Sequence, residues 1–188
     1  MTLPPRFYDF AQVVLGMRTS AARLSPHLAR MANASVVDVG GGTAIYGRRL
    51  PGSVGYLCLD LDASKLRRAR STGVRVMQCD ATLIALAPKS VDFALCIALA
   101  HHLPDPALKD VFREINRVVR RQMLFVDAVA GPRLSVSGLL WALDNGSYPR
   151  SEDQLLAAIT DAFVCDHVEA YEGYHRYLMC VASPRPVR

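Results

Sequence analysis

The sequence has no long apolar run and no signal-peptide pattern. Its longest apolar stretches, such as "FALCIALA" at 93–100, fall far short of the roughly 20 residues that a membrane-spanning helix needs. The first ten residues, "MTLPPRFYDF", lack a basic segment followed by an apolar one. We therefore predict neither a membrane span nor a signal peptide.

Cysteine pairs at metal-binding or redox spacing are also missing. The cysteines are five in number, which is odd, and they lie far apart in apolar runs. This usage is typical of free thiols in a reducing compartment, so we predict a cytoplasmic protein. No His/Asp/Glu cluster has ligand spacing either, so we predict no metal site. The cysteines are Cys58, Cys79, Cys96, Cys165 and Cys180.

The composition of the 188 residues is that of a globular protein. Hydrophobic residues make up 51% and charged residues 21%, which argues against disorder. The length favours a single domain. The net charge of +5 permits an anionic partner without requiring one.

Strand-like and helix-like segments alternate along the chain. Short β-branched or apolar runs predict strands, and segments with helical periodicity lie between them. The predicted strands are 35–39, 54–60, 74–80, 90–99, 122–129, 163–171 and 174–182. The predicted helices lie within the first thirty residues and at 44–50, 63–72, 105–119 and 151–163.

Capping residues mark several of these helices. Ser25, followed by Pro26, predicts the start of a second N-terminal helix. Asp62 is placed to cap the predicted helix at 63–72, and Gly73 is placed to stop it. The stretch Ser151–Gln154 fits a capping box.

This alternation predicts the fold class. Strands that alternate with helices form a parallel sheet with helices on both faces. The last two predicted strands are separated only by Glu172 and Gly173, which indicates a hairpin. We predict an α/β, Rossmann-like doubly wound fold with a mostly parallel seven-stranded sheet and a C-terminal antiparallel hairpin. A ligand of such a sheet binds at the carboxyl ends of the strands.

The stretch "VVDVGGGTAIYG", at 36–47, places three glycines directly after a strand. Gly42 and Gly47 have Walker A spacing, but two arginines follow in place of Lys and Ser or Thr. Gly40 and Gly42 fit a dinucleotide fingerprint, but the third position is Ile45, where the helix must pack closely on the strand. Neither phosphate-binding template is complete.

Carboxylates at the ends of three predicted strands suggest a different ligand. Asp60 lies 18 residues beyond Gly42 (60 − 42), the position that binds ribose hydroxyls. Asp38 precedes the glycines and favours a cationic group on the ligand. Asp80 ends the third strand, where it can accept a hydrogen bond from an exocyclic amine. Together they favour a cationic nucleoside over a pyrophosphate.

The chain here resembles the class I S-adenosylmethionine-dependent methyltransferases, in particular the small-molecule group related to ubiquinone and menaquinone biosynthesis. The resemblance rests on "VVDVGGGTA", "CLDLDASKL", "CDATLIAL", "VDFALCIALAHHLPD" and "REINRVV", in the order and spacing of that family. It implies S-adenosylmethionine as the methyl donor. By position, it assigns the methionine part to Asp38, Gly40 and Gly42, the ribose to Asp60, the adenine ring to Leu61, and the adenine amine and ring edge to Asp80 and Ala81.

Two positions depart from the pattern of that family. Ala44 stands where the family has its third glycine, and "RRQ" replaces the usual Pro-Gly-Gly before the fifth strand. We expect one domain, 1–188. In it, N-terminal helices at 1–33 cover the pocket, 34–128 bind the cofactor, and 129–188 form the substrate side with a lid and the hairpin.

His101 and His102 follow the fourth strand, where the methyl group would be presented. A histidine is a natural general base for a hydroxyl or phenol, so either is a candidate catalytic residue. The alternative is that one packs against the cofactor while the other shapes the pocket. Further residues that could face a substrate are Tyr8, Trp141, Tyr148 and His175.

We predict methyl transfer to a small, hydrophobic or aromatic acceptor. One alternative is a protein of the same fold that binds the cofactor without catalysis. The basic clusters "KLRRAR" and "RVVRRQ" keep an RNA methyltransferase as another, although "ALAHH" is unlike the motif of enzymes that methylate base amines. A nucleic-acid partner is thus a minority interpretation, and an NAD-dependent oxidoreductase ranks third.

Overall fold

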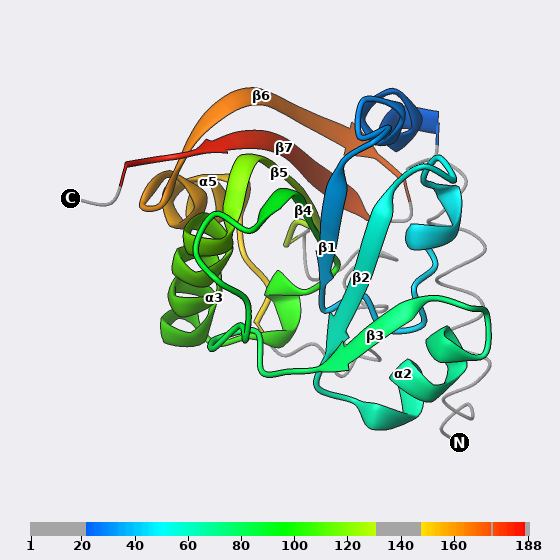
Figure 1. The fold of residues 1–188 in the computed structure, drawn as a ribbon. Coiled ribbons are helices and arrows are strands. Elements are labelled where there is room, and N and C mark those ends of the chain that lie inside the picture. Colours follow the sequence, from blue (N-terminus) through cyan, green and yellow to red (C-terminus); the bar gives the residue numbers. More distant parts are fainter. Residues whose placement is uncertain (1–21, 131–147, 174, 187–188) are drawn as a thin grey trace, which may run out of the picture.

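Seven strands form one mixed sheet with helices on both faces (Figure 1). The computed structural model describes residues 22–130, 148–173 and 175–186. The strands are β1 (Ser35–Val39), β2 (Gly55–Asp60), β3 (Arg75–Gln78), β4 (Val91–Ile97), β5 (Val119–Ala128), β6 (Phe163–Glu172) and β7 (Arg176–Pro184). The labelled helices are η1 (Gly47–Arg49), α2 (Ala63–Arg70), η2 (Ala100–His102), α3 (Asp105–Val118) and α5 (Glu152–Thr160).

The strand order is β3-β2-β1-β4-β5-β7-β6, and it confirms the predicted fold class. β1 pairs in parallel with both β2 and β4, so the strand order reverses beside β1. Only β7 is antiparallel to its neighbours β5 and β6, as the predicted hairpin requires. The reversal beside β1 is the position where doubly wound sheets open a crevice for a ligand.

Each face of the sheet has its own apolar cluster. On one face, α3 and α5 pack on β4, β5 and β7, and the Phe112 ring meets the edge-on rings of Phe125 and Phe163. On the other face, the helical residues 22–29 bury Leu24 and Leu28 against β1, β4, β5 and β7. Both faces of the central strands are therefore buried, which explains their nearly continuous apolar sequences.

The predicted caps of α2 and α5 are confirmed. The Asp62 carboxylate accepts the N–H groups of Ser64 and Lys65 at the start of α2. Ser151 and Gln154 form the reciprocal capping box of α5. Along α3, one apolar stripe is buried and places the helix firmly on the sheet: Leu108, Val111, Phe112, Ile115 and Val118.

The predicted helix at 44–50 is wrong. Only the short 3-10 turn η1 forms there. Gly42 and Ala44 have φ of +55° and +58°, a left-handed backbone that cannot start a right-handed helix. Gly47 has no room for a side chain, because the Tyr56 ring occupies the Cβ position.

Three predicted boundaries also differ. The residues before Ser25 are already helical from residue 22, so Ser25 does not start that helix. β5 begins directly after α3, at Val119 rather than at Gln122, because Val119 pairs with Val91. α5 ends at Thr160, since Phe163 already belongs to β6.

Candidate functional site

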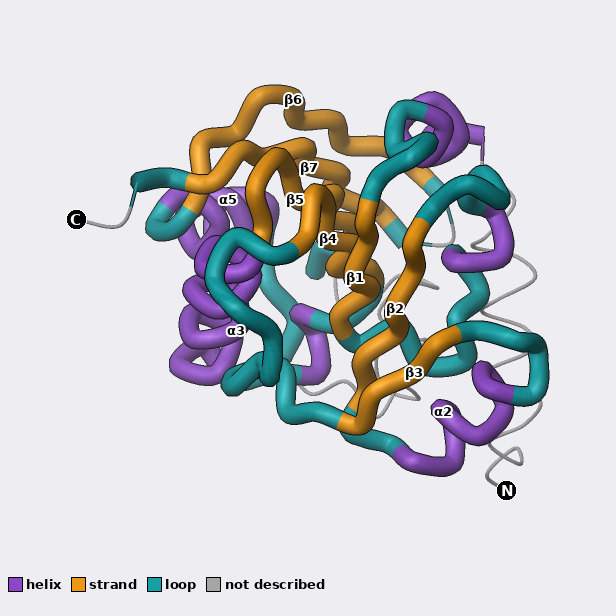
Figure 2. The backbone as a smooth tube through the Cα atoms, viewed as in Figure 1, coloured by secondary structure: helices purple, strands orange, loops and turns teal. Residues whose placement is uncertain are grey.

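The site is built where the chain leaves the carboxyl ends of the parallel strands. Loops and short helices follow β1, β2 and β4 at this edge of the sheet (Figure 2). The ends of β2 and β3 are joined there, because the Cys79 N–H donates to the Asp60 carbonyl over 3.1 Å. The candidate residues at the ends of β1, β2 and β3 thus lie along one edge of the sheet.

Left-handed backbone at alternate positions shapes the glycine loop. Gly40, Gly42 and Ala44 have φ of +71°, +55° and +58°. Glycine adopts this conformation freely, whereas Ala44 carries the steric cost and is fully buried. A Cβ at Gly40 would lie 2.8 Å from the Leu99 side chain, so the chain after β4 packs directly on this loop.

Gly41 matters for a different reason and was missed from the sequence. A Cβ there would lie 2.6 Å from Cγ of Asp38 and 2.8 Å from Sγ of Cys58. The backbone of the loop therefore rests directly on the Asp38 carboxyl group. Only glycine allows this approach without displacing one of the two side chains.

Asp38 is 1% exposed and lies beneath the glycine loop. The Tyr56 hydroxyl donates to its Oδ2 over 2.5 Å. Burial raises the pKa of Asp38 to about 6, although the bond from Tyr56 opposes the shift and the nearby Asp60 adds to it. A buried carboxyl group in this state favours a cationic partner that would stabilise its ionised form.

Asp60 holds the loop from the next strand. Its Oδ2 accepts the Gly42 N–H over 2.9 Å, and its Oδ1 accepts the Asp62 N–H over 2.8 Å. The carboxylate is partly exposed, and Leu61 beside it is 68% exposed. This arrangement leaves an accessible carboxylate next to an accessible apolar side chain, as a ribose and an adenine ring require.

Asp80 follows β3 on the same edge and is exposed, with Ala81 partly exposed beside it. Its Oδ1 accepts the Thr82 N–H and hydroxyl, at 2.8 Å and 2.7 Å. These bonds lower the pKa of Asp80, with the backbone N–H of Thr82 as the larger cause. The carboxylate is therefore ionised and fixed in direction, as an acceptor for an amine must be.

The two candidate histidines differ in burial. His101 lies in η2 and is 9% exposed, whereas His102 is exposed. Nδ1 of His101 lies 2.6 Å from Oδ1 of Asp127, a buried residue near the end of β5. The imidazole centroids of His101 and His102 are 4.0 Å apart.

Asp127 also accepts two backbone N–H groups. Ala100 donates to its Oδ2 over 2.6 Å and Ala128 to its Oδ1 over 2.7 Å. A carboxylate engaged in this way acts as an acceptor, so Nδ1 of His101 carries a proton and donates. In the neutral ring Nε2 is then the basic nitrogen. We call His101 and Asp127 the His–Asp pair.

The sequence interpretation missed Asp127, although a signal was present. It is the one carboxylate in the apolar run "QMLFVDAV", at 122–129. Asp38, Asp60 and Asp80 were selected because they end strands, and Asp127 lies near the end of a strand in the same way. What the sequence lacks is any sign that this residue contacts His101.

Two of the four predicted substrate-facing residues are described, and Tyr148 contacts the backbone of His101. Tyr148 is 42% exposed, and its N–H donates to the His101 carbonyl over 3.1 Å. His175 lies in the β6–β7 turn and is 8% exposed. The adjacent Arg176 carbonyl accepts the Val129 N–H just beyond β5. Tyr8 and Trp141 lie outside the described residues.

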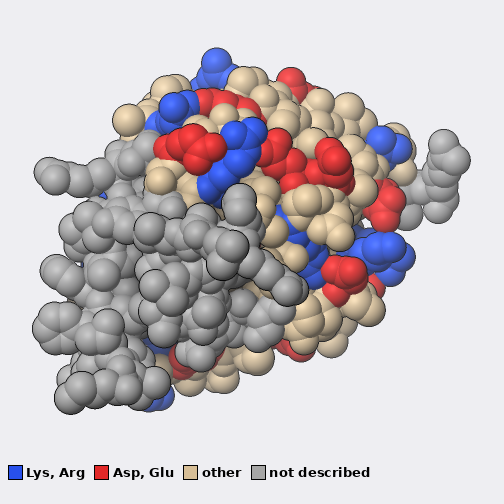
Figure 3. All heavy atoms as spheres, turned by 180° about the vertical axis from the view of Figure 1, so that it is seen from behind, with Lys and Arg blue, Asp and Glu red and all other residues tan. Residues whose placement is uncertain are grey.

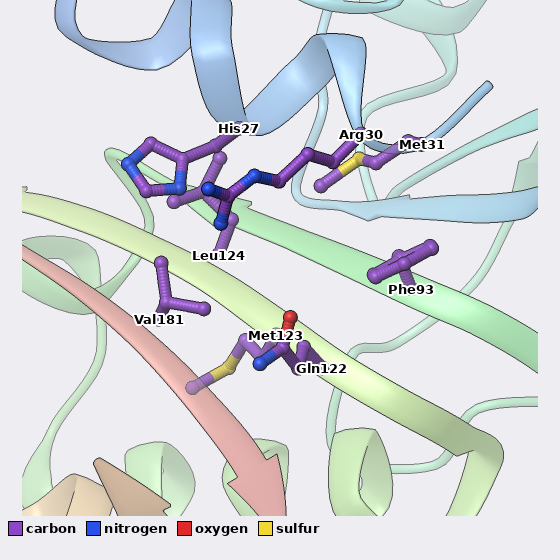
Figure 4. A pocket seen from close by; sticks show the side chains of 8 residues that line it. All are labelled: His27, Arg30, Met31, Phe93, Gln122, Met123, Leu124 and Val181. Atoms are coloured by element: carbon purple, nitrogen blue, oxygen red, sulfur yellow. The ribbon is translucent and has the colours of Figure 1, made fainter. Parts of the chain in front are cut away.

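A small pocket is not part of this site (Figure 4). It lies between the end of helical residues 22–29, with the two residues that follow, and strands β4, β5 and β7, with Arg30, Phe93 and Gln122 among its lining residues. Phe93 and Gln122 stand near the starts of their strands, away from the carboxyl ends. Its volume of 20 Å³ holds about one water molecule, far too little for a nucleoside.

Comparison with known proteins agrees with this geometry. Residues 36–122 match the family described as "Methyltransferase domain". No curated protein matches the sequence. The solved structures described next are 14–18% identical, a level at which the likeness concerns the fold alone.

Three structures show the range of the fold. Geranyl diphosphate C-methyltransferase from Streptomyces coelicolor A3(2), solved with Mg²⁺, geranyl diphosphate and S-adenosyl-L-homocysteine, has a TM-score of 0.72 at 14% identity, covering 89% of this chain and 80% of that one. A SAM-dependent methyltransferase from Aquifex aeolicus has a TM-score of 0.67 at 18% identity, covering 87% and 89%. The [4+2]-cyclase SpnF has a TM-score of 0.70 at 15% identity, covering 88% and 81%.

Two further findings concern membrane spans and metal binding. No helix among the described residues is both long and apolar enough to cross a membrane. Within the same residues, no group of three or more His, Cys, Asp or Glu side chains could hold a metal ion. The absence of a metal requirement stays a prediction.

The strand order, the glycine loop resting on Asp38, the carboxylates along the same edge and the matched domain agree with one another. These features, together with the methyltransferase-domain match at residues 36–122, support an S-adenosylmethionine-dependent methyltransferase.

Proposed function

We propose that the chain methylates a small, hydrophobic or aromatic acceptor that loses a proton during the reaction, with His101 as the general base. The observation that carries the proposal is the His–Asp pair. It is buried, and two backbone N–H groups, those of Ala100 and Ala128, also donate to Asp127. The Leu99 side chain in the same turn packs on Gly40 of the glycine loop. A base at this position is adjacent to the cofactor loop.

The described residues fit the cofactor. We propose that Asp38, Gly40 and Gly42 bind its methionine part, that Asp60 and Leu61 bind the ribose and adenine, and that Asp80 and Ala81 bind the adenine edge. The backbone at Gly42 supports this assignment, because its φ of +55° favours glycine and a Cβ there would meet only ordinary contacts, the nearest at 3.6 Å. When bound, S-adenosylmethionine supplies a methyl group that its sulfonium makes electrophilic.

The residues of the chain then have two tasks. Nε2 of His101 accepts the proton of the acceptor as the new bond to the methyl carbon forms, which prevents a positively charged product. The carboxylate of Asp127 stabilises the resulting imidazolium and keeps the ring oriented. A positioned base of this kind contributes roughly 10²–10⁴-fold to the rate.

Tyr148 and His175 are proposed to face the acceptor. Both come from the part of the chain that follows β5, which supports the division into a cofactor-binding half at 34–128 and a substrate side at 129–188. The finer resemblance to ubiquinone- and menaquinone-type methyltransferases also belongs to this proposal. Its support is the sequence motifs, including "HH" after the fourth strand.

A nucleic-acid acceptor finds less support. Among the described residues visible in Figure 3, Lys and Arg side chains are interspersed with Asp and Glu. A nucleic-acid surface needs a contiguous basic patch. RNA methylation therefore stays the lesser alternative, and steep weakening of binding with added salt would favour it.

The first experiment is a thermal-shift comparison of S-adenosylhomocysteine with NAD and ATP. A ligand at 100 times its Kd stabilises the folded state by about 2.7 kcal/mol. We expect stabilisation by S-adenosylhomocysteine alone. A response to NAD or ATP instead would contradict the assignment of the glycine loop.

Asp60→Ala tests the residue assignment within that experiment. The variant loses the proposed ribose carboxylate, and we expect the Kd of S-adenosylhomocysteine to rise roughly 10–100-fold, as for a lost charged hydrogen-bonding group. Asp110→Ala is the matched control, because Asp110 lies on the exposed side of α3 and pairs with Arg113, away from the glycine loop. Equal affinities of the two variants would refute the ribose assignment.

A further inference from the structure

Arg150 is a buried cation close to the His–Asp pair. It is 6% exposed and directly precedes the capping box of α5. An arginine is almost never this deeply buried unless its donors are satisfied. The identity of its partners therefore indicates what it does.

Two of the partners are backbone carbonyls of one short turn. Nη1 donates to the Ala100 carbonyl over 2.7 Å, and Nη2 donates to the Leu103 carbonyl over 2.6 Å. These two residues flank His101 and His102. The guanidinium thus bridges the start and the end of the turn that carries both histidines.

The same group is connected to two further elements. Nη1 also donates to the Tyr148 carbonyl over 3.3 Å, and Nε donates to Oδ1 of Asp105 at the start of α3 over 2.8 Å. The Arg150 carbonyl accepts the Ala130 N–H over 2.7 Å, just beyond β5. Arg150 therefore joins the η2 turn to α3, to the end of β5 and to the backbone at Tyr148.

The turn itself is poorly supported by its own residues. η2 is a three-residue 3-10 helix without a side-chain cap, and such short helices make few internal bonds. Ala98 just before it has φ of +55°. A planar fork of donors can bond several carbonyls at once, which a lysine ammonium cannot do in the same geometry.

We propose that Arg150 is a positioning residue that holds the η2 turn so that Nδ1 of His101 points at Asp127. This inference rests on the proposed function for its meaning in catalysis. The geometric claim is independent of methyl transfer. The experiment is designed to test that claim without an acceptor.

The readout is the Nδ1 proton of His101, followed by NMR on the full chain uniformly labelled with ¹⁵N. A proton held between the ring and buried Asp127 should give a low-field signal that exchanges slowly with water. His101→Gln identifies the signal by its loss. If the wild-type protein lacks this signal, the pair itself is absent, which overturns both the role of Arg150 and the proposed function.

Arg150→Met keeps much of the side-chain volume but removes every donor. We expect the exchange of the His101 proton to accelerate at least tenfold more than the exchange of the Phe112 and Ile115 amides in α3. Arg150→Lys should accelerate it by an intermediate factor. Arg113→Met, on the exposed side of α3, is the control that should leave it unchanged.

Two further outcomes would overturn the proposal. One is an unchanged His101 signal in Arg150→Met. The other is acceleration of the His101 proton and the α3 amides by the same factor, which would show that Arg150 stabilises the fold as a whole. Acceleration confined to the η2 turn is the signature of positioning.

Discussion

The residues proposed for the cofactor, here called the cofactor side, are held together differently from the His–Asp pair and Arg150, here called the acceptor side. On the cofactor side, Asp80 bonds to Thr82 two residues away, and one oxygen of Asp60 accepts the N–H of Asp62. On the acceptor side, His101 meets Asp127 across 26 residues, and Arg150 reaches Ala100 across 50. The cofactor side thus combines local turns with contacts between neighbouring strands, such as that of Asp60 with Gly42 across 18 residues, whereas the acceptor side exists only when distant elements are packed.

This difference has a consequence for substitution. A change on the cofactor side should alter ligand affinity with limited effect on the acceptor side. A change in the His–Asp pair should alter the rate of transfer while the cofactor remains bound.

The largest effect is expected for Asp127→Asn. The asparagine keeps the shape of the side chain but cannot stabilise an imidazolium, so we expect kcat to fall roughly 10²–10⁴-fold. The assay follows transfer from radiolabelled S-adenosylmethionine to an acceptor found by screening small phenols and other hydrophobic compounds. The Kd of S-adenosylhomocysteine should stay the same, and unchanged kcat would exclude His101 as an Asp127-dependent base.

Gly41→Ala should disturb the cofactor side strongly. The new methyl group would lie 2.6 Å from Cγ of Asp38, so either the loop or the carboxyl group must move. Overpacking of this kind costs about 1–3 kcal/mol. We expect that loss in chemical denaturation, together with a Kd for S-adenosylhomocysteine raised at least tenfold.

Gly52→Ala is the matched control for that variant. Its Cβ would have no heavy atom within 4 Å. The control should leave both affinity and stability unchanged. Similar losses in the two variants would show that Gly41 has no special place beneath the loop.

The pH dependence of cofactor binding should report on Asp38. Its pKa is about 6, so about a tenth of the carboxyl groups are ionised at pH 5 and about nine tenths at pH 7. If the ligand ammonium binds the ionised form, affinity rises with pH, and the Kd falls about tenfold over this range. Calorimetric titration with S-adenosylhomocysteine at both pH values measures it.

Asp38→Asn provides the comparison for this prediction. The amide preserves the contact with Tyr56 but does not titrate. Its Kd should be nearly independent of pH between 5 and 7. A wild-type Kd that stays constant across the same range would rule out an ionisable contact at this position.

The smallest effect is expected for Asp62→Ala. The aspartate caps α2, and losing such a cap costs about 1 kcal/mol. Unfolding by urea should show this cost. Because the cap is not assigned to the ligand, cofactor affinity should change little, and a loss as large as that of Asp60→Ala would extend the ribose site to Asp62.

The success of the sequence interpretation follows the same division. The caps of α2 and α5, the buried stripe of α3 and the strand alternation were predicted because each depends on residues close together in the chain. The error at 44–50 has a tertiary cause. The helix signal there was overridden by the left-handed backbone at Ala44 and by the Tyr56 ring packed against Gly47.

The sequence by itself determined the fold class and the carboxylates of the cofactor side. Hydrophobic periodicity and turn residues act over a few positions, and the order of the strands brings their carboxyl ends to one edge. Only the tertiary structure decided that Asp127 meets His101 and that Arg150 bonds to both ends of the η2 turn. Those contacts arise because β5, η2 and the start of α5 pack around shared buried polar groups, and local sequence does not encode such neighbours.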